Sequence, residues 1–318
     1  MTPNPISVTF DIGDGRMVTI ETGKLARQAD GAVTVRLGNC IILATVVANK
    51  EPKEGQNFFP LSVDYHEKFA SAGRVPGSFF KREARLNDYE ILTSRLIDRA
   101  LRPLFPEDYL CDVQVLISLV SSDAEVLPDA LGCLAASAAL AVSNIPIQEI
   151  ISEVRIGRKN GVFIVDPSRT ELAECDLEFL IAATEKNIMM VEGEANECQE
   201  EDLIKAIELG HEAIKIQIKA QADLRDQVGS AVKREYTKPY RNEELNEKIS
   251  AFAKEKMYTI SASASAKHDR SDAYDALKKE VKEFLGEELP AEDKGLIGHY
   301  FGELQYYVVR DMILNDRK

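Results

Sequence analysis

Two adjacent aromatic residues and two adjacent cations stand together in Phe79-Phe80-Lys81-Arg82. An aromatic ring offers a face on which an unpaired base stacks, and a guanidinium group grips phosphate oxygens. Because the chain has a formal net charge of −14 at pH 7, these cations form a local basic spot in an acidic protein. The pattern predicts a site for a single-stranded nucleic acid and not a surface that coats DNA. Adjacent aromatic residues are also common in protein cores, and that alternative stays open for both phenylalanines.

Three further cations, Arg95, Arg99 and Arg102, follow at spacings of four and three residues. On a helix these positions fall within about 60° of one another. Three guanidinium groups on one stripe repel each other unless anions or carboxylates lie opposite. They extend the predicted cationic surface, although Glu90 and Asp98 could instead make this an ordinary salt-bridged helix.

A loop and a helix are the elements that must position these groups. Residues 70–80 form a predicted loop in which Gly73 and Gly77 supply the backbone freedom to expose aromatic and basic side chains. Helical periodicity begins near Asp88, an acceptable N-cap, and ends before Pro103. We therefore expect the three arginines on one helix directly after the loop.

The rest of the first part mixes strands and helices. Alternating apolar residues separated by glycine-bearing turns predict hairpins, and an apolar run predicts a buried strand. An alanine-rich helix over residues 128–142 begins with proline in its first turn and implies close packing on a sheet. A later long helix carries the apolar stripe Leu203, Ile207, Ile214 and Ile218. The predicted strands are residues 7–10, 17–20, 33–35, 41–47 and 113–120.

The character of the chain changes after Gly229. Residues 233–242 read as a connector, and every element beyond them has helical periodicity. One later stripe is Leu245, Ile249 and Phe252, and another is Leu304, Val308 and Met312. We expect an α+β domain over residues 1–235 and a small all-α domain over residues 236–318.

Bulk properties agree with a two-domain globular protein. The 318 residues are 45% hydrophobic and 29% charged, and no apolar run approaches the roughly 20 residues of a membrane span. The first residues lack a secretory signal, and five dispersed cysteines predict reduced thiols in a cytoplasmic protein. The chain stops directly after a helix at Lys318, which we interpret as the end of a fragment.

Several long runs resemble bacterial polynucleotide phosphorylase, and the resemblance covers the chain from end to end. It also includes Pro128-Asp129, which opens the alanine-rich helix. The matching runs are TGKLARQA at 22–29, FFPLSVDY at 58–65, GRVPGSFFKRE at 73–83 and LIDRALRPLFP at 96–106.

In that family each subunit holds two RNase PH-like cores separated by a helical domain, followed by KH and S1 domains. This chain resembles the first core, of the ribosomal protein S5 domain 2-like fold, plus the helical domain that links it to an absent second core. The resemblance implies a polyribonucleotide nucleotidyltransferase, which degrades RNA from its 3′ end with phosphate and releases nucleoside diphosphates. It further implies a homotrimeric ring, with magnesium and inorganic phosphate used by the full-length enzyme and none expected on this piece. Single-stranded RNA, and partner proteins of RNA degradation, are the expected partners, in the cytoplasm and with no membrane.

The resemblance also assigns roles to residues. Phe79, Phe80, Lys81 and Arg82 match the first core's aromatic-basic loop, which lines the RNA path. By the same match the helix with Arg95, Arg99 and Arg102 continues this cationic surface; the closest matches are Arg99 and Arg102.

The catalytic pattern of the family's second core is missing. That core uses Asp-x5-Asp-x-Lys to hold metal and supply a cation, whereas Leu172, Glu178 and Leu180 stand at those positions here. Where the active core has serines that hold phosphate, this chain has Asp129, whose carboxylate would repel phosphate. The resemblance therefore implies no catalytic residue and no metal ligand in this chain, which we expect to be inactive alone.

Two alternatives remain open. The chain could be a non-catalytic RNA-binding or structural subunit of an exosome-like ring. It could also be a metal-dependent hydrolase, because Asp176 and Glu178 are two residues apart and share one side of a strand. Two carboxylates make a poor magnesium site, so a solvated strand face is the favoured interpretation of this pair.

Overall fold

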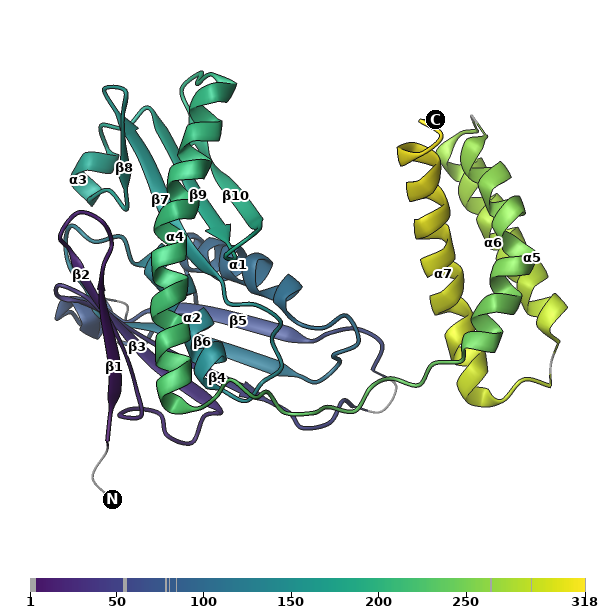
Figure 1. Cartoon of the computed structure of the whole chain (residues 1–318), viewed down its shortest axis with the longest axis horizontal. Helices are drawn as coiled ribbons and strands as arrows, with labels where there is room; N and C mark the ends of the chain where they lie inside the picture. The colour runs from purple at the N-terminus through teal and green to yellow at the C-terminus, as the bar shows by residue number, and fades with distance from the viewer. Residues whose placement is uncertain are drawn as a thin grey trace. The chain divides into compact units, whose positions relative to one another are not determined.

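The computed structural model describes residues 4–53, 56–77, 79, 81–83, 85–263, 265–286 and 288–317. It divides into two compact units, Met1–Lys238 and Pro239–Lys318 (Figure 1). The first unit mixes sheets and helices and the second is helical, so the α+β class followed by an all-α region is confirmed.

A six-stranded sheet forms the base of the first unit, in the order β1-β2-β3-β4-β6-β5. Neighbouring strands are antiparallel except for β5 and β6, which run parallel. Every strand predicted for residues 7–47 and 113–120 is present. The strands are β1 (Ile6–Asp11), β2 (Met17–Thr22), β3 (Gly31–Leu37), β4 (Cys40–Ala48), β5 (Leu61–Glu67) and β6 (Val113–Ser121).

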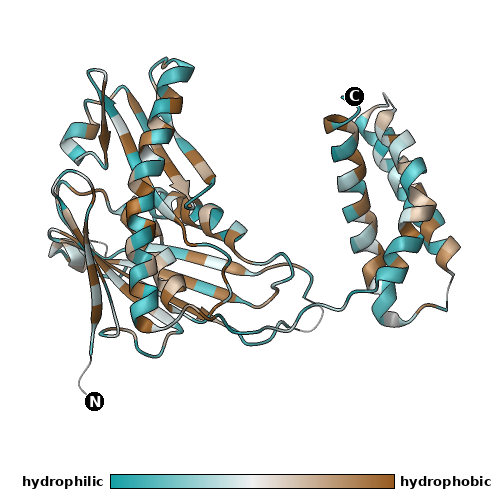
Figure 2. Cartoon of the chain, viewed as in Figure 1, coloured by the Kyte–Doolittle hydropathy of each residue, from teal (hydrophilic) through white to brown (hydrophobic). Residues whose placement is uncertain are grey.

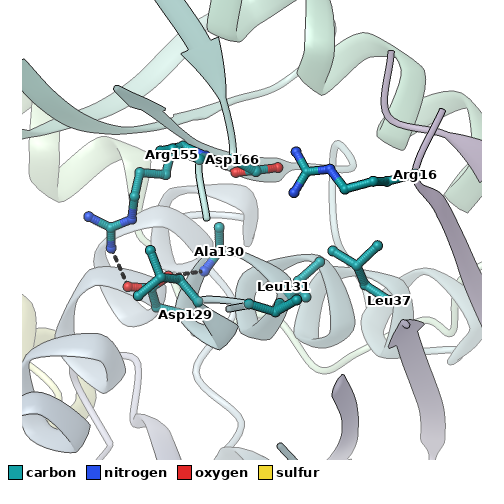
Figure 3. A pocket seen from close by; sticks show the side chains of 10 residues that line it. Arg16, Leu37, Asp129, Ala130, Leu131, Arg155 and Asp166 are labelled. Atoms are coloured by element: carbon teal, nitrogen blue, oxygen red, sulfur yellow. Dashed lines mark hydrogen bonds and ion pairs between the residues drawn. The ribbon is translucent and has the colours of Figure 1, made fainter. Parts of the chain in front are cut away.

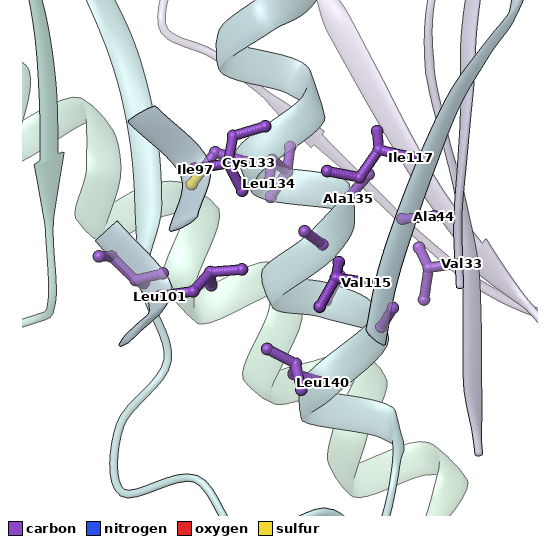
Figure 4. Close-up of a cluster of buried hydrophobic side chains, with 14 of the residues drawn as sticks. Val33, Ala44, Ile97, Leu101, Val115, Ile117, Cys133, Leu134, Ala135 and Leu140 are labelled. Atoms are coloured by element: carbon purple, nitrogen blue, oxygen red, sulfur yellow. The ribbon is translucent and has the colours of Figure 1, made fainter. Parts of the chain in front are cut away.

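Helix α2 (Pro128–Val142) is the central element of the core, as its alanine content predicted. All of its residues are buried; the sheet covers one side of it, and α1 (Asp88–Leu101) is one of the elements that cover the rest (Figure 4). Small side chains allow this approach: a Cβ added at Gly31 would lie 2.1 Å from the carbonyl oxygen of Ala139. The packing of α2 on the sheet therefore requires glycine on β3.

A second sheet, of order β10-β9-β7-β8, is antiparallel throughout. Helix α4 (Glu200–Val228) packs against strands of both sheets (Figure 1), and Ile214 and Ile218 of its predicted stripe are buried. The remaining elements of this region are β7 (Ser152–Lys159), β8 (Val162–Val165), α3 (Arg169–Leu172), β9 (Leu177–Ala183) and β10 (Ile188–Ala195).

The N-cap of helix α1 lies one residue before the predicted cap. Asn87, not Asp88, is the N-cap: its side chain accepts a hydrogen bond from the Glu90 amide at 2.9 Å. The Glu90 carboxylate in turn accepts one from the Asn87 amide at 2.8 Å, which completes a capping box. The helix ends at Leu101, as the following Pro103 predicted.

The segment after α4 is fastened to the first unit. The Lys233 ammonium group donates to the carbonyl oxygens of Leu140, Ala141 and Ser143 at the end of α2, at 3.1, 2.8 and 2.7 Å. The Arg234 guanidinium group donates to the carbonyl oxygen of Asn49 at 2.8 Å. These contacts explain why the compact unit continues to Lys238.

The second unit has its own core. Helices α5 (Glu243–Ala262), α6 (Lys267–Leu285) and α7 (Ala291–Leu314) pack apolar side chains against one another. Hydrophobic and hydrophilic residues alternate along the ribbons of these helices (Figure 2). Leu245, Ile249, Phe252, Leu304 and Val308 of the predicted stripes all belong to this cluster.

The remaining sequence expectations concern membranes and cysteines. In the part of the chain that the structure describes, no helix is both long and apolar enough to cross a bilayer. All five cysteines are free thiols, as predicted; Cys40, Cys111 and Cys133 are buried and Cys175 and Cys198 are partly buried.

Candidate nucleic-acid interface

A groove of about 1160 Å³ runs between α1 and the outer strand β5. It brings together all three arginines that the sequence placed on one stripe: Arg95, Arg99 and Arg102. Its other lining residues are Leu61, Ser62, Val63, Asp64, Leu92, Ser94, Leu96, Asp98, Pro103 and Glu192.

Strand β5 is at the edge of the sheet, and side chains of α1 form hydrogen bonds with its backbone where a further strand would otherwise do so. The Tyr65 amide donates to the Ser94 hydroxyl at 2.9 Å, and the Glu67 amide donates to the Glu90 carboxylate at 2.8 Å. At the other end of the strand, the Arg102 guanidinium donates to the carbonyl oxygen of Leu61 at 3.3 Å. The wall of the groove is therefore held in place by hydrogen bonds along its length.

Two of the three arginines are already paired. Arg99 forms an ion pair with Glu192 of β10 at 2.7 Å, and Arg102 contacts both carboxylate oxygens of Asp98 at 2.8 and 2.6 Å. The salt-bridged alternative thus describes Arg99 and Arg102. Arg95 is exposed, and none of the ion pairs formed within the described residues includes it. Arg95 is the guanidinium group most readily available to an anion in this groove.

The aromatic-basic loop projects its described side chains outward. Phe79 is 93% exposed, so the alternative that it is a core residue is wrong. Lys81 and Arg82 are exposed as well. Phe80 lies outside the residues that the structure describes.

Glu83 ties the end of this loop to its beginning near Phe69. Its carboxylate accepts a hydrogen bond from the Phe69 amide at 2.7 Å and pairs with the Lys68 ammonium group at 3.3 Å. The hydrogen bond from Phe69 lowers the pKa of Glu83, because it stabilises the charged form. Gly73, with φ of 65°, ends the short 3-10 helix Phe69–Ala72 in the left-handed conformation that glycine tolerates. Sequence reasoning singled out the loop but not the role of Glu83.

The region of the missing catalytic pattern is filled by a guanidinium group. Arg155 of β7 pairs with Asp129 at the start of α2 (Figure 3). It also pairs with Glu178 of β9. The cavity beside Arg155 and Asp129 is only about 20 Å³, roughly one water molecule, whereas Leu172 and Glu178 line a separate open pocket of about 510 Å³. Because a cation of the protein occupies the space between the two carboxylates, the arrangement does not fit a magnesium ion or a phosphate group.

The interpretation of Asp176 and Glu178 as a solvated strand face is wrong for Glu178, which pairs with Arg155 and is partly buried. Asp176 accepts two hydrogen bonds from Arg158, at 2.8 and 2.9 Å, and these lower the pKa of its carboxyl group. The two carboxylates therefore have different cationic partners. Among the described residues, no group of three or more His, Cys, Asp and Glu side chains is placed to hold a metal ion.

Two further carboxyl groups lie near Arg155: Glu153, which is buried, and Asp166, which is partly buried. Burial, together with the negative charge of Asp129, raises the pKa of Glu153 to about 8 and that of Asp166 to about 6. Asp166 faces Arg16 across the small cavity (Figure 3). The sequence did not single out these residues, because their burial depends on elements that meet only in the fold.

Comparison with known families gives three matches along the chain. Residues 14–146 match domain 1 of the 3′ exoribonuclease family, and residues 149–213 match domain 2 of the same family. Residues 244–318 match the RNA binding domain of polyribonucleotide nucleotidyltransferase. The loop lies within the first match, and so do all lining residues of the groove except Glu192, which lies within the second.

Curated relatives carry the name polyribonucleotide nucleotidyltransferase. The protein of Parabacteroides distasonis is 51% identical over 99% of this chain, and that of Christiangramia forsetii is 49% identical over 99%. The chain spans 42% of the length of each of these relatives. Among solved structures, rice Rrp46 is 16% identical with a TM-score of 0.49, covering 72% of this chain and 96% of its own.

Proposed function

The chain belongs to the 3′ exoribonuclease family and is similar along its length to polyribonucleotide nucleotidyltransferases, and from this premise we propose that it guides RNA in such an enzyme. In the proposal, the whole enzyme degrades RNA from its 3′ end with phosphate and releases nucleoside diphosphates. The first unit is its first RNase PH-like core, and the helical unit is the domain that leads to a second core. The single observation that carries the role in guidance is the exposed Phe79 in the loop that precedes α1, the helix whose three arginines line the groove.

The physical basis is stacking combined with phosphate contacts. An exposed Phe79 ring can accept any base, since stacking contributes about 1–3 kcal/mol per base without regard to sequence. Lys81 and Arg82 follow it, and Arg95 lies in the groove on the adjacent helix. Phe80, Arg99 and Arg102 complete the proposed RNA-binding set; Arg99 and Arg102 would exchange carboxylate partners for phosphates or hold the wall of the groove.

Catalysis belongs to residues outside this chain in our proposal. Arg155 occupies the space between Asp129 and Glu178, so the protein's own cation excludes the metal and the phosphate that phosphorolysis requires. Magnesium and phosphate would therefore serve the second core of the full-length enzyme.

The assembly and location follow from the same proposal. We propose a homotrimeric ring for the full-length protein, working in the cytoplasm with other proteins of RNA degradation. The matched RNA binding domain of residues 244–318 supports contacts between the helical unit and RNA as well.

The deciding experiment titrates the chain against labelled oligo(A) RNA at low and moderate salt while released nucleoside diphosphate is measured in the same tube. We expect salt-sensitive binding without diphosphate release. Robust diphosphate release, with phosphate and magnesium present, would show that the active site lies within this chain and would overturn the assignment.

Replacing Arg95 with alanine tests the groove. We expect weaker RNA binding and a salt dependence reduced by about one phosphate contact, because an available guanidinium group releases counterions when it binds phosphate. Arg27→Ala is the matched control, since Arg27 is exposed on a different part of the same unit. Equal salt slopes for the two variants would count against the groove as the RNA site.

A further inference from the structure

Helix α7 carries an apolar groove of about 490 Å³ on its outer side. Spacings of three and four residues place the lining positions on one face of the helix. Tyr306, Ile313 and Leu314 are each more than half exposed, so this face is open to solvent within the helical unit. The lining residues are Gly302, Gln305, Tyr306, Val309, Arg310, Ile313 and Leu314.

An aromatic pair fixes the geometry of the groove. The rings of Tyr306 and Tyr307 meet edge to face, with centroids 5.3 Å apart and planes at 78°. This arrangement orients the Tyr306 ring, which lines the groove. An oriented, exposed aromatic ring is the element on which proteins stack unpaired bases.

Gly302 lies one turn before Tyr306 and leaves space beside its ring. A Cβ added at Gly302 would meet nothing within 4 Å, so packing within the chain does not explain the glycine. Glycine in a helix interior lowers helix stability relative to alanine. Because Gly302 has no side chain, a planar group such as a base has room to lie against the helix backbone next to Tyr306.

The charge of the groove favours an anion. The sequence from residue 239 to 318 contains 16 Asp and Glu residues against 13 Lys and Arg residues. The described residues that line the groove nevertheless include no carboxylate, and their one charged side chain is Arg310. Arg310 follows Tyr306 by four residues, which places a phosphate-binding group one turn from a base-stacking group.

We propose that this face of α7 binds a nucleotide of single-stranded RNA, with the base on Tyr306 and its phosphate on Arg310. The inference rests on the proposed function, because it gives the helical unit an RNA contact of its own. It assigns two residues that the aromatic-basic loop and the arginine groove do not include.

The test measures binding of fluorescein-labelled oligo(U) RNA by the 318-residue chain, using fluorescence anisotropy. We expect Tyr306→Ala and Arg310→Ala each to weaken binding about fivefold or more, and Tyr306→Phe to keep the wild-type affinity because its ring can still stack. Lys254→Ala, an exposed cation on α5, is the control and should bind like wild type. Oligo(U) carrying 4-thiouridine should form photocrosslinks to α7.

The outcomes separate this inference from the proposed function. If Arg95→Ala weakens binding while the Tyr306 and Arg310 variants bind normally without crosslinks on α7, the inference is overturned and the proposed function stands. If wild type binds no RNA, both are overturned. As a last check, the oligomeric state of wild type and Tyr306→Ala is measured by sedimentation at rising protein concentration. If wild type dimerises and Tyr306→Ala does not, while both bind RNA with the same affinity, α7 is a protein interface and the inference is overturned.

Discussion

Arg155 is the residue whose role the sequence could not reveal. Its partners Asp129 and Glu178 come from α2 and β9, and neither is close to it along the chain. Reading the sequence did identify the loss of the Asp and Lys positions at Leu172 and Leu180. It could not say what fills the vacated space, because the pairing depends on two elements meeting in the fold.

Removing the Arg155 guanidinium group should be strongly destabilising. Arg155→Ala leaves the buried Asp129 carboxylate without its cation, and breaking a buried pair in this way lowers the free energy of unfolding by about 3–5 kcal/mol. Urea unfolding measures the change. Arg99→Ala, which breaks an exposed pair with Glu192, is the control and should lower the free energy of unfolding by less than about 1 kcal/mol. Similar losses in both variants would contradict the assigned burial.

The buried carboxyl group of Glu153 should make stability depend on pH. Burial raises its pKa from 4.5 to about 8, so between these values the folded protein keeps a proton that the unfolded chain releases. This group therefore favours folding fully below pH 4.5, and its contribution is lost as the pH rises toward 8. Glu153→Gln should flatten that part of the curve of unfolding free energy against pH. A mutant curve parallel to that of wild type from pH 5 to 8 would rule out Glu153 as the titrating group.

At the scale of elements, α1 both builds the arginine groove and covers β5. Periodicity predicted the helix, and composition predicted α2 at its observed bounds. The sequence could not show that Glu90 and Ser94 form hydrogen bonds with the backbone of β5, since polar residues on a helix are normally expected to face solvent. The N-cap was misplaced by one residue because Asn87 and Asp88 are both good caps, and the capping box with Glu90 selects Asn87.

The cap of α1 can be tested directly. Asn87→Ala should lower the free energy of unfolding by about 1 kcal/mol, because the Glu90 amide loses its hydrogen-bond acceptor. Asn87→Asp should keep most of the stability, since aspartate also caps. Thermal denaturation followed by circular dichroism compares the two variants, and an unaffected Asn87→Ala protein would mean that the cap is dispensable.

At the scale of the whole molecule, the chain has separate cores in its two units. The helical core is built from side chains between Leu245 and Val308, and the segment before it is fastened to the first unit through Lys233 and Arg234. The sequence indicated two domains by a change of periodicity. It could not reveal the Lys233 contacts, which reach back about 90 residues to the end of α2.

Because its core is self-contained, the polypeptide 239–318 should fold alone. We expect a helical circular dichroism spectrum and a single cooperative thermal transition. Leu245→Asp, which places a charge in the core, is the control that should abolish the transition. A broad, non-cooperative melt of the unmutated polypeptide would show that the helical unit depends on other parts of the protein.

The way α1 covers β5 also bears on aggregation. An uncovered outer strand offers free amide and carbonyl groups to strands of other molecules, and such edges seed aggregates. Glu90, Ser94 and Arg102 bond to those groups at both ends of β5. Strand addition from a neighbouring chain is thereby blocked at this edge, so the helix that carries the three arginines also keeps the sheet from growing past β5.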